Sequence, residues 1–237
     1  MKALRILLLL ILLFISNPTT TQTMGNKPTA EVIKYSQQGT TKAVTSDASR
    51  IESLLAQLLP LRTKLSKEDI ILKAARHFVG IPYVAHTLDR NNEEMLVVNT
   101  REMDCTTYLE YVIAVVLCVD KNLSRYSDFT RMLQNIRYRQ GRLAYENRLH
   151  YYQWWVTDNQ QMGYVKEISA PNPPFTATQK LKINYMSENS NAYDMLRNRP
   201  QRVAALKKLE DQTNGTIVPY IPKKQLTNTE LLRKVVR

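Results

Sequence analysis

The chain has 237 residues, 43% of them hydrophobic, and a formal net charge of +12. This length suits one sizeable domain and is short for two, and the apolar fraction predicts a packed core rather than a disordered chain. The charge favours an acidic partner: nucleic acid, anionic lipid or an acidic polymer such as peptidoglycan. Because the basic residues are scattered, with no Gly-rich or aromatic-basic repeat, nucleic acid is not expected.

The first 49 residues predict an export signal followed by a linker. Lys2 and Arg5 precede a run of ten apolar residues, Ile6 to Ile15, and small polar residues follow. This pattern is typical of a secretory signal peptide, here residues 1–23, and the run is too short to span a bilayer about 30 Å thick. Residues 24–49 are polar and predict a linker. We therefore expect export to the periplasm or beyond, without a stable membrane anchor.

Two helices are predicted next. Apolar residues at helical spacing predict a helix from Ile51 to Leu59. A second helix is expected after Ser66, which can act as its N-cap, and Gly80 ends it. His77 lies on this second helix beside its core face, and we interpret it as a packing or surface residue rather than a ligand.

The segment from Gly80 to Val98 predicts a turn and a short strand. The turn, Gly80 to Asp89, carries Tyr83 and His86. Residues 96–98 are apolar and able to pair as a short strand before the next helix.

The strongest chemical signal lies in the segment that begins at Met103. Asp104 can cap a first turn, and the apolar residues that follow show no two-residue alternation, so a buried helix is predicted to begin near Cys105. Free backbone N–H groups and the helix dipole favour a thiolate at that position, as in papain-like cysteine enzymes. The alternative is that Cys105 is a small buried hydrophobe. Cys118 is about 20 Å further along the same helix, too far for a disulfide, and is expected in the core.

The elements downstream of this helix are shorter. A helix is predicted from about Tyr126 to Ile136, and a basic helix from roughly Ser190 to Asp211. Prolines separate several further pieces. These are extended at 163–168, 179–183 and 215–220, and helical and polar at 228–237.

Several motifs, in this order, resemble one family. They read Phe78 to Leu88 (FVGIPYVAHTL), Leu96 to Asn99 (LVVN), Asp104 to Glu110 (DCTTYLE), Arg137 to Gly141 (RYRQG) and Arg148 to Trp155 (RLHYYQWW). Together they resemble the N-acetylmuramoyl-L-alanine amidases of the NlpC superfamily of bacterial cell-wall cysteine hydrolases. The resemblance covers roughly residues 51 to 225 and is strongest from 78 to 110.

The resemblance implies an α+β, papain-like NlpC-type fold over residues 50–237, with a helical N-terminal half. It implies attack by the Cys105 thiolate on the amide that joins N-acetylmuramic acid to L-alanine, with a backbone N–H at the helix start holding the oxyanion. Muropeptides would be the partners, and no cofactor or metal is expected. Asp104 would cap the helix at the substrate site, and Tyr83 would order the site.

Other predicted substrate-binding residues lie in the last motif. Arg148 offers a bidentate clamp for a carboxylate, and Tyr151 and Trp155 offer flat faces for a sugar ring. The alternative is structural: the aromatic residues of this motif would pack in a core, and Tyr83 would pack beneath its turn.

The general base is the missing part of the predicted mechanism. Cysteine acyl transfer needs an imidazole near the sulfur. In the superfamily this histidine follows the cysteine helix, in a His-Val-Gly context preceded by Gly-Asp-Ile, and neither sequence occurs here. The histidines of this chain are His77, His86 and His150. We favour a chain that is cut short or degenerate, with an incomplete final sheet, over the alternative that His150 acts as the base. We assign no chemistry to His86.

Three functions remain open from the sequence. The first is a cell-wall amidase, active or inactive as given. The second is a protein that binds muropeptides without cleaving them. The third is a basic, exported interaction protein.

Overall fold

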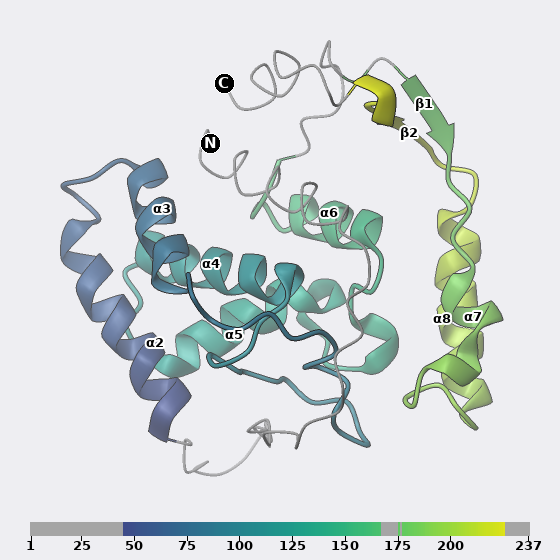
Figure 1. Ribbon diagram of the computed structural model, residues 1–237, viewed down its shortest axis with the longest axis horizontal. Coiled ribbons are helices and arrows are strands. Elements are labelled where there is room, and N and C mark those ends of the chain that lie inside the picture. Colours follow the sequence, from purple (N-terminus) through teal and green to yellow (C-terminus); the bar gives the residue numbers. More distant parts are fainter. Residues whose placement is uncertain (1–44, 167–174, 176, 226–237) are drawn as a thin grey trace. The chain divides into compact units, whose positions relative to one another are not determined.

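The computed structural model describes residues 45–166, 175 and 177–225, which fall into two units (Figure 1). The first unit comprises residues 45–91 and 95–143, and the second comprises 92–94 and the described residues from 144 onward. The predicted signal peptide, residues 24–44 of the predicted linker and the helical piece at 228–237 lie outside the described residues. Within the described ranges, no helix is both long and apolar enough to cross a bilayer.

The first unit is built from helices packed around α4. Figure 1 shows α2, α3 and α5 beside α4, and each of the three contacts it. The helices are α2 (Thr45–Leu58) with η2 (Leu59–Leu61), α3 (Lys67–His77), α4 (Cys105–Asp120), α5 (Tyr126–Arg137) and η3 (Arg139–Gly141). The interior of α4 is almost wholly apolar and buried, so burial of its side chains in the centre of the unit stabilises the helix.

Local signals set the ends of the predicted helices. Ser66 caps α3 by accepting the Asp69 N–H at 3.1 Å, and Gly80 adopts φ +92° just beyond the helix, as predicted. Helix α2 begins at Thr45, inside the segment predicted as linker. The reason is that Ala48 and Ile51 already face the core, although the residues around them are polar.

The predicted short strand at residues 96–98 is buried but is not part of a sheet; it contains one bridge position, at Val97. Side chains hold this segment instead. Arg137 Nη1 donates to the Val97 carbonyl at 2.7 Å, and the Tyr138 hydroxyl donates to the Met95 carbonyl at 3.2 Å. A run of three apolar residues therefore marks a buried segment here, which pairs at a single bridge position and is also held by side chains.

A buried ion pair joins α4 to α5. Arg137 Nε lies 2.7 Å from Glu110 Oε2, and both side chains are buried. Burial would lower the pKa of Arg137, but the Glu110 carboxylate beside it raises that pKa above its ordinary value, so the guanidinium stays charged. Glu110 belongs to the DCTTYLE motif and Arg137 to the RYRQG motif, so two of the sequence motifs contact each other in the core.

The second unit combines short helices with one two-stranded sheet. Strands β1 and β2 pair antiparallel, with Ala177 opposite Tyr220 and Lys180 opposite Ile217. Helices α7 and α8 pack together. The elements are η4 (Tyr145–Asn147), α6 (Tyr152–Gln161), β1 (Ala177–Lys180), α7 (Tyr185–Glu188), η5 (Ser190–Ala192), α8 (Pro200–Thr213), β2 (Ile217–Tyr220) and η6 (Lys223–Gln225).

These elements bear out the predicted α+β class in its general form, and they differ from the prediction in detail. The strand predicted at 215–220 is present in shortened form as β2, whereas the one predicted at 179–183 is shifted towards the N-terminus, since β1 spans 177–180. The long helix predicted from Ser190 begins only at Pro200. Asn198 has φ +58°, which is outside the right-handed helical region, and the residue before a proline is also disfavoured in helical conformation. Within the described residues there is no larger sheet of the papain-like kind.

The buried ion pair gives a first prediction. Replacing Arg137 with Met leaves the Glu110 carboxylate buried without its cation, so we expect a loss of about 3–5 kcal/mol in the free energy of unfolding, measured by urea denaturation with circular dichroism. Lys207→Met is the matched control, because Lys207 forms its 2.8 Å pair with Asp211 on the exposed surface and should leave the urea midpoint unchanged. Equal midpoints for the two variants would contradict the structural role of the buried pair.

A second prediction concerns alkaline pH. Burial, and next the charge of Asp128, raises the pKa of the Cys118 thiol from 9.0 to about 12. The unfolded thiol ionises near its ordinary pKa, whereas the folded thiol stays neutral, so stability is retained below about pH 9 and falls as the pH rises towards 12. Tyr111 contributes in the same direction from about pH 10, because burial raises its pKa to about 12. Cys118→Ala should therefore flatten, without abolishing, the decline of the urea midpoint between pH 9 and 11; an unchanged slope would contradict the assignment.

Candidate active site

Cys105 is the first residue of α4, as the sequence predicts. Asp104 is the N-cap: its carboxylate accepts the Thr107 N–H at 2.8 Å, and its own N–H donates to Thr107 Oγ1 at 2.9 Å. Cys105 itself is partly exposed. Within the described residues, the N–H groups of Cys105 and Thr106 have no hydrogen-bond acceptor. Two donors and the positive end of the helix dipole are therefore available to an anion beside the sulfur.

The turn that carries Tyr83 is joined to the residue before the N-cap. Met103 donates to the Pro82 carbonyl at 3.1 Å and accepts the Val84 N–H at 3.0 Å, which forms a parallel bridge between Tyr83 and Met103. Burial raises the pKa of Tyr83, and the charges of Cys105 and then Asp104 raise it further. The bridge places Tyr83 beside Met103, two residues before Cys105. Its side chain is 67% exposed, so the alternative of a ring packed beneath the turn is wrong.

The two histidines of the first unit have other surroundings. The ring of His77 packs edge-on against Phe78, and burial, followed by the charge of Arg50, lowers the pKa of His77. His86 is exposed, with Nδ1 3.7 Å from Asp89 Oδ2. Within this unit, no hydrogen bond joins either imidazole to Cys105. The interpretation of His77 as a packing or surface residue agrees with these contacts.

His150 and Arg148 lie in the second unit beside Tyr145. His150 Nε2 donates to the Tyr145 carbonyl at 2.8 Å. The Arg148 guanidinium lies 4.8 Å from the centre of the Tyr145 ring, and Arg148 Nε is 3.7 Å from Glu94 Oε1. Arg148 is buried by these neighbours. Its proposed role as a carboxylate clamp and that of His150 as a base stay predictions.

The aromatic residues of the same motif pack inside the second unit. Tyr151 donates from its hydroxyl to Glu210 Oε1 at 2.6 Å and accepts the Met186 N–H at 3.0 Å. Trp155 is only 3% exposed. These contacts favour the structural alternative for Tyr151 and Trp155, and their roles in sugar binding stay predictions.

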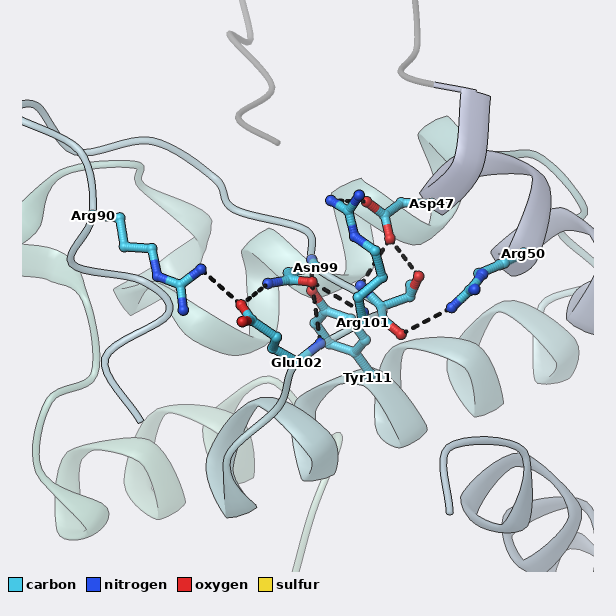
Figure 2. Close-up of polar contacts among 8 residues, drawn as sticks. Asp47, Arg50, Arg90, Asn99, Arg101, Glu102 and Tyr111 are labelled. Atoms are coloured by element: carbon cyan, nitrogen blue, oxygen red, sulfur yellow. Dashed lines mark hydrogen bonds and ion pairs between the residues drawn. The ribbon is translucent and has the colours of Figure 1, made fainter. Parts of the chain in front are cut away.

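Sequence reasoning missed a polar network beside the cysteine helix. Figure 2 shows it: side chains from α2, from the Asn99–Glu102 loop and from α4 are joined by hydrogen bonds and ion pairs. Asp47, on α2, accepts the Thr100 N–H at 2.8 Å, and Tyr111, on α4, accepts the Asn99 N–H at 2.6 Å. Asp47 lies in the segment predicted as linker, and Asn99 was identified only as part of the LVVN motif.

The described part of the chain holds no cluster of three His, Cys, Asp or Glu residues suited to a metal ion.

Comparison with known proteins identifies a family. Residues 73–236 match the model of the AmiA-like family, described as N-acetylmuramoyl-L-alanine amidase-like. The crystal structure of an N-acetylmuramoyl-L-alanine amidase from Bacteroides uniformis is 38% identical, with a TM-score of 0.61, and the match covers 66% of this chain and 65% of that one. A protein from Bacteroides fragilis, provisionally named a xylanase, is also 38% identical, with a TM-score of 0.59 and coverage of 65% and 66%.

A protein of the DUF1460 family from Legionella pneumophila is 19% identical, with a TM-score of 0.50 over 76% of this chain and 66% of that one, which is a likeness of fold alone. No curated protein matches the chain. The chain spans 65–66% of the length of the two Bacteroides structures.

The contrast between the two cysteines gives a third prediction. With iodoacetamide near pH 6, we expect Cys105 to be alkylated at least about tenfold faster than Cys118, because Cys105 is partly exposed at a helix start whereas Cys118 is buried. Peptide mass spectrometry measures the two rates. In urea the two thiols should react alike, which is the control. Equal, slow labelling of the folded chain would contradict an activated thiol.

Proposed function

Because the chain belongs to the N-acetylmuramoyl-L-alanine amidase-like family, we propose that it is a cell-wall amidase that uses Cys105 to cleave the bond between N-acetylmuramic acid and L-alanine in muropeptides. The observation that carries the proposal is the placement of a partly exposed thiol on the first residue of α4, beside Tyr83. The proposal includes the NlpC superfamily, which the DCTTYLE and GIPY motifs support. It also includes export, because the substrate lies outside the cytoplasm.

The start of α4 supplies the first step of such a reaction. The thiolate attacks the carbonyl carbon of the muramyl amide, and the carbonyl oxygen becomes an oxyanion. The N–H groups of Cys105 and Thr106 are the donors available to hold that charge. Departure of the L-alanyl amine, which takes up a proton, leaves a thioester on Cys105. Water then hydrolyses the thioester, releases the muramyl carboxylate and restores the thiol.

Tyr83 is suited to orient the substrate. Its side chain is largely exposed, so its ring and hydroxyl are accessible to a ligand beside the sulfur. A phenol at its ordinary pKa is already neutral at physiological pH, and the pKa of Tyr83 is raised above that value, so the hydroxyl can donate a hydrogen bond. The basic character of the chain also suits the carboxylates of muropeptides.

The reaction also needs a group that takes the thiol proton and later protonates the leaving amine. His150 follows the cysteine helix in sequence and stays the alternative candidate for this group. The Bacteroides structures extend beyond the part that this chain matches. The activity of a whole family member therefore forms part of the proposal.

A second candidate function is muropeptide binding without hydrolysis. The observation that favours it is that neither His77 nor His86 hydrogen-bonds to Cys105 in the first unit, while His150 Nε2 is bonded to the Tyr145 carbonyl. Under this alternative, the native chain and Cys105→Ala bind a muropeptide equally well and neither releases a peptide.

The fourth prediction tests the amidase. The native chain should release L-alanyl peptide from an N-acetylmuramoyl peptide, followed by chromatography and mass spectrometry. Cys105→Ala should lower the rate at least about a thousandfold, because it removes the nucleophile. Cys118→Ala is the matched control and should keep a near-native rate. Equal hydrolysis by Cys105→Ala would exclude the cysteine mechanism. Binding without release by the native chain would favour the second candidate.

A further inference from the structure

The residues that lead into Cys105 form a loop without regular secondary structure, yet each backbone N–H from 99 to 104 has an identified acceptor. The acceptors, in order, are the Tyr111 hydroxyl at 2.6 Å, Asp47 Oδ1 at 2.8 Å, Asn99 Oδ1 at 3.0 and 3.2 Å, the Pro82 carbonyl at 3.1 Å and Thr107 Oγ1 at 2.9 Å. Five of the six N–H groups donate to side-chain oxygens, and only the Met103 N–H donates to a backbone carbonyl. The loop is therefore fixed by specific side chains rather than by a sheet or helix.

Helix α2 holds the centre of this loop at Thr100. Asp47 accepts both the N–H and the hydroxyl of Thr100, and Arg50, on the next turn, donates to the Thr100 carbonyl at 3.3 Å. The Asp47 carboxylate is 3% exposed, and its second oxygen lies 3.6 Å from Arg101 Nη2. Three atoms of Thr100 are thus bound from a helix about fifty residues upstream, by the Asp47 and Arg50 side chains labelled in Figure 2.

The two flanks of Thr100 are fixed from other directions. On one side, the Asn99 N–H donates to Tyr111, which belongs to α4 itself. On the other side, Glu102 accepts from Asn99 Nδ2 at 3.0 Å and from Arg90 Nη1 at 2.7 Å. Movement of Thr100 would therefore strain bonds to α2 and α4 together.

We propose that Asp47 is a positioning residue for Cys105: by holding Thr100, it fixes the loop that places the thiol at the start of α4. This inference rests on the proposed function, in which Cys105 is the nucleophile. Asp47 does not touch the reacting atoms; it acts through Thr100 and the loop. Since a displacement of about 1 Å can cost a reaction roughly a hundredfold, a clamp of this kind has a measurable effect on the chemistry.

The fifth prediction compares three variants with the native chain. Asp47→Ala removes both bonds to Thr100 and should lower kcat for the muropeptide roughly a hundredfold with little change in KM, and slow Cys105 alkylation at least about tenfold. Asp47→Asn keeps an acceptor oxygen and should recover part of both rates. Leu133→Ala, in the core of α5, is the control: it lowers the urea midpoint while leaving kcat and the alkylation rate near native.

The readouts separate this inference from the proposed function. If the native chain does not hydrolyse muropeptide, the amidase proposal fails, and the alkylation rate still tests the role of Asp47. An Asp47→Ala alkylation rate equal to or above the native rate overturns the positioning role. If Asp47→Ala does not fold, Thr100→Val, which loses one hydroxyl bond, takes its place. The positioning role is also overturned if a folded Thr100→Val and Asp47→Asn both keep the native rates of hydrolysis and alkylation. Reduced rates in both variants would support the positioning role.

Discussion

The start of helix α4 must be held from two sides, and the rest of the first unit depends on this constraint. A helix begins with N–H groups that its own backbone cannot satisfy, and any ligand-binding role requires some of them to stay available. Asp104 meets the first requirement by accepting the Thr107 N–H, while the N–H groups of Cys105 and Thr106 stay available to a ligand. The loop before Asp104 holds the helix start from the other side, because each of its own N–H groups is bonded to an acceptor elsewhere in the unit.

One face of α4 organises the segments around it. Thr107, Glu110 and Tyr111 are buried polar residues at positions i, i+3 and i+4, so they project on the same side of the helix. Each binds a different segment: Thr107 binds the N-cap, Glu110 binds Arg137 at the end of α5, and Tyr111 binds Asn99 in the loop. Because a buried polar group without a partner is costly, these three residues specify where the neighbouring segments lie. The apolar remainder of α4 supplies burial energy without that specificity.

The sequence predicts the parts of this arrangement that depend on local chemistry. The cap at Ser66, the cap at Asp104 and the start of α4 at Cys105 follow from residues three or four positions apart, and the structure confirms them. The role of Tyr83 in the site is predicted only through the family resemblance. The role of Asp47 was beyond reach, because its bond to Thr100 joins residues 53 positions apart and nothing in the polar sequence around Asp47 indicates it.

The motif at residues 148–155 shows a different limit. Arginine next to several aromatic residues is the composition of both a sugar-binding surface and a tightly packed interior. Composition alone does not distinguish the two, and the structure places Arg148 and Trp155 among buried neighbours. Similarly, three apolar residues at 96–98 fit a strand or a buried coil. In the structure the segment is buried with one bridge position, and Arg137, forty positions away, donates to the Val97 carbonyl.

The use of a charged residue for the Asp47 clamp has a physical rationale. Apolar packing is not directional, so it would leave Thr100 free to shift. One carboxylate oxygen that accepts two donors from Thr100 instead fixes both the position and the orientation of Thr100. Burying that charge is costly, and Arg101 compensates only partly at 3.6 Å, since its side chain is 40% exposed. An apolar pair of similar volume would be expected to give equal or better stability. The presence of the carboxylate is therefore explained better by the geometry it imposes on the residues before Cys105 than by any gain in the stability of the fold.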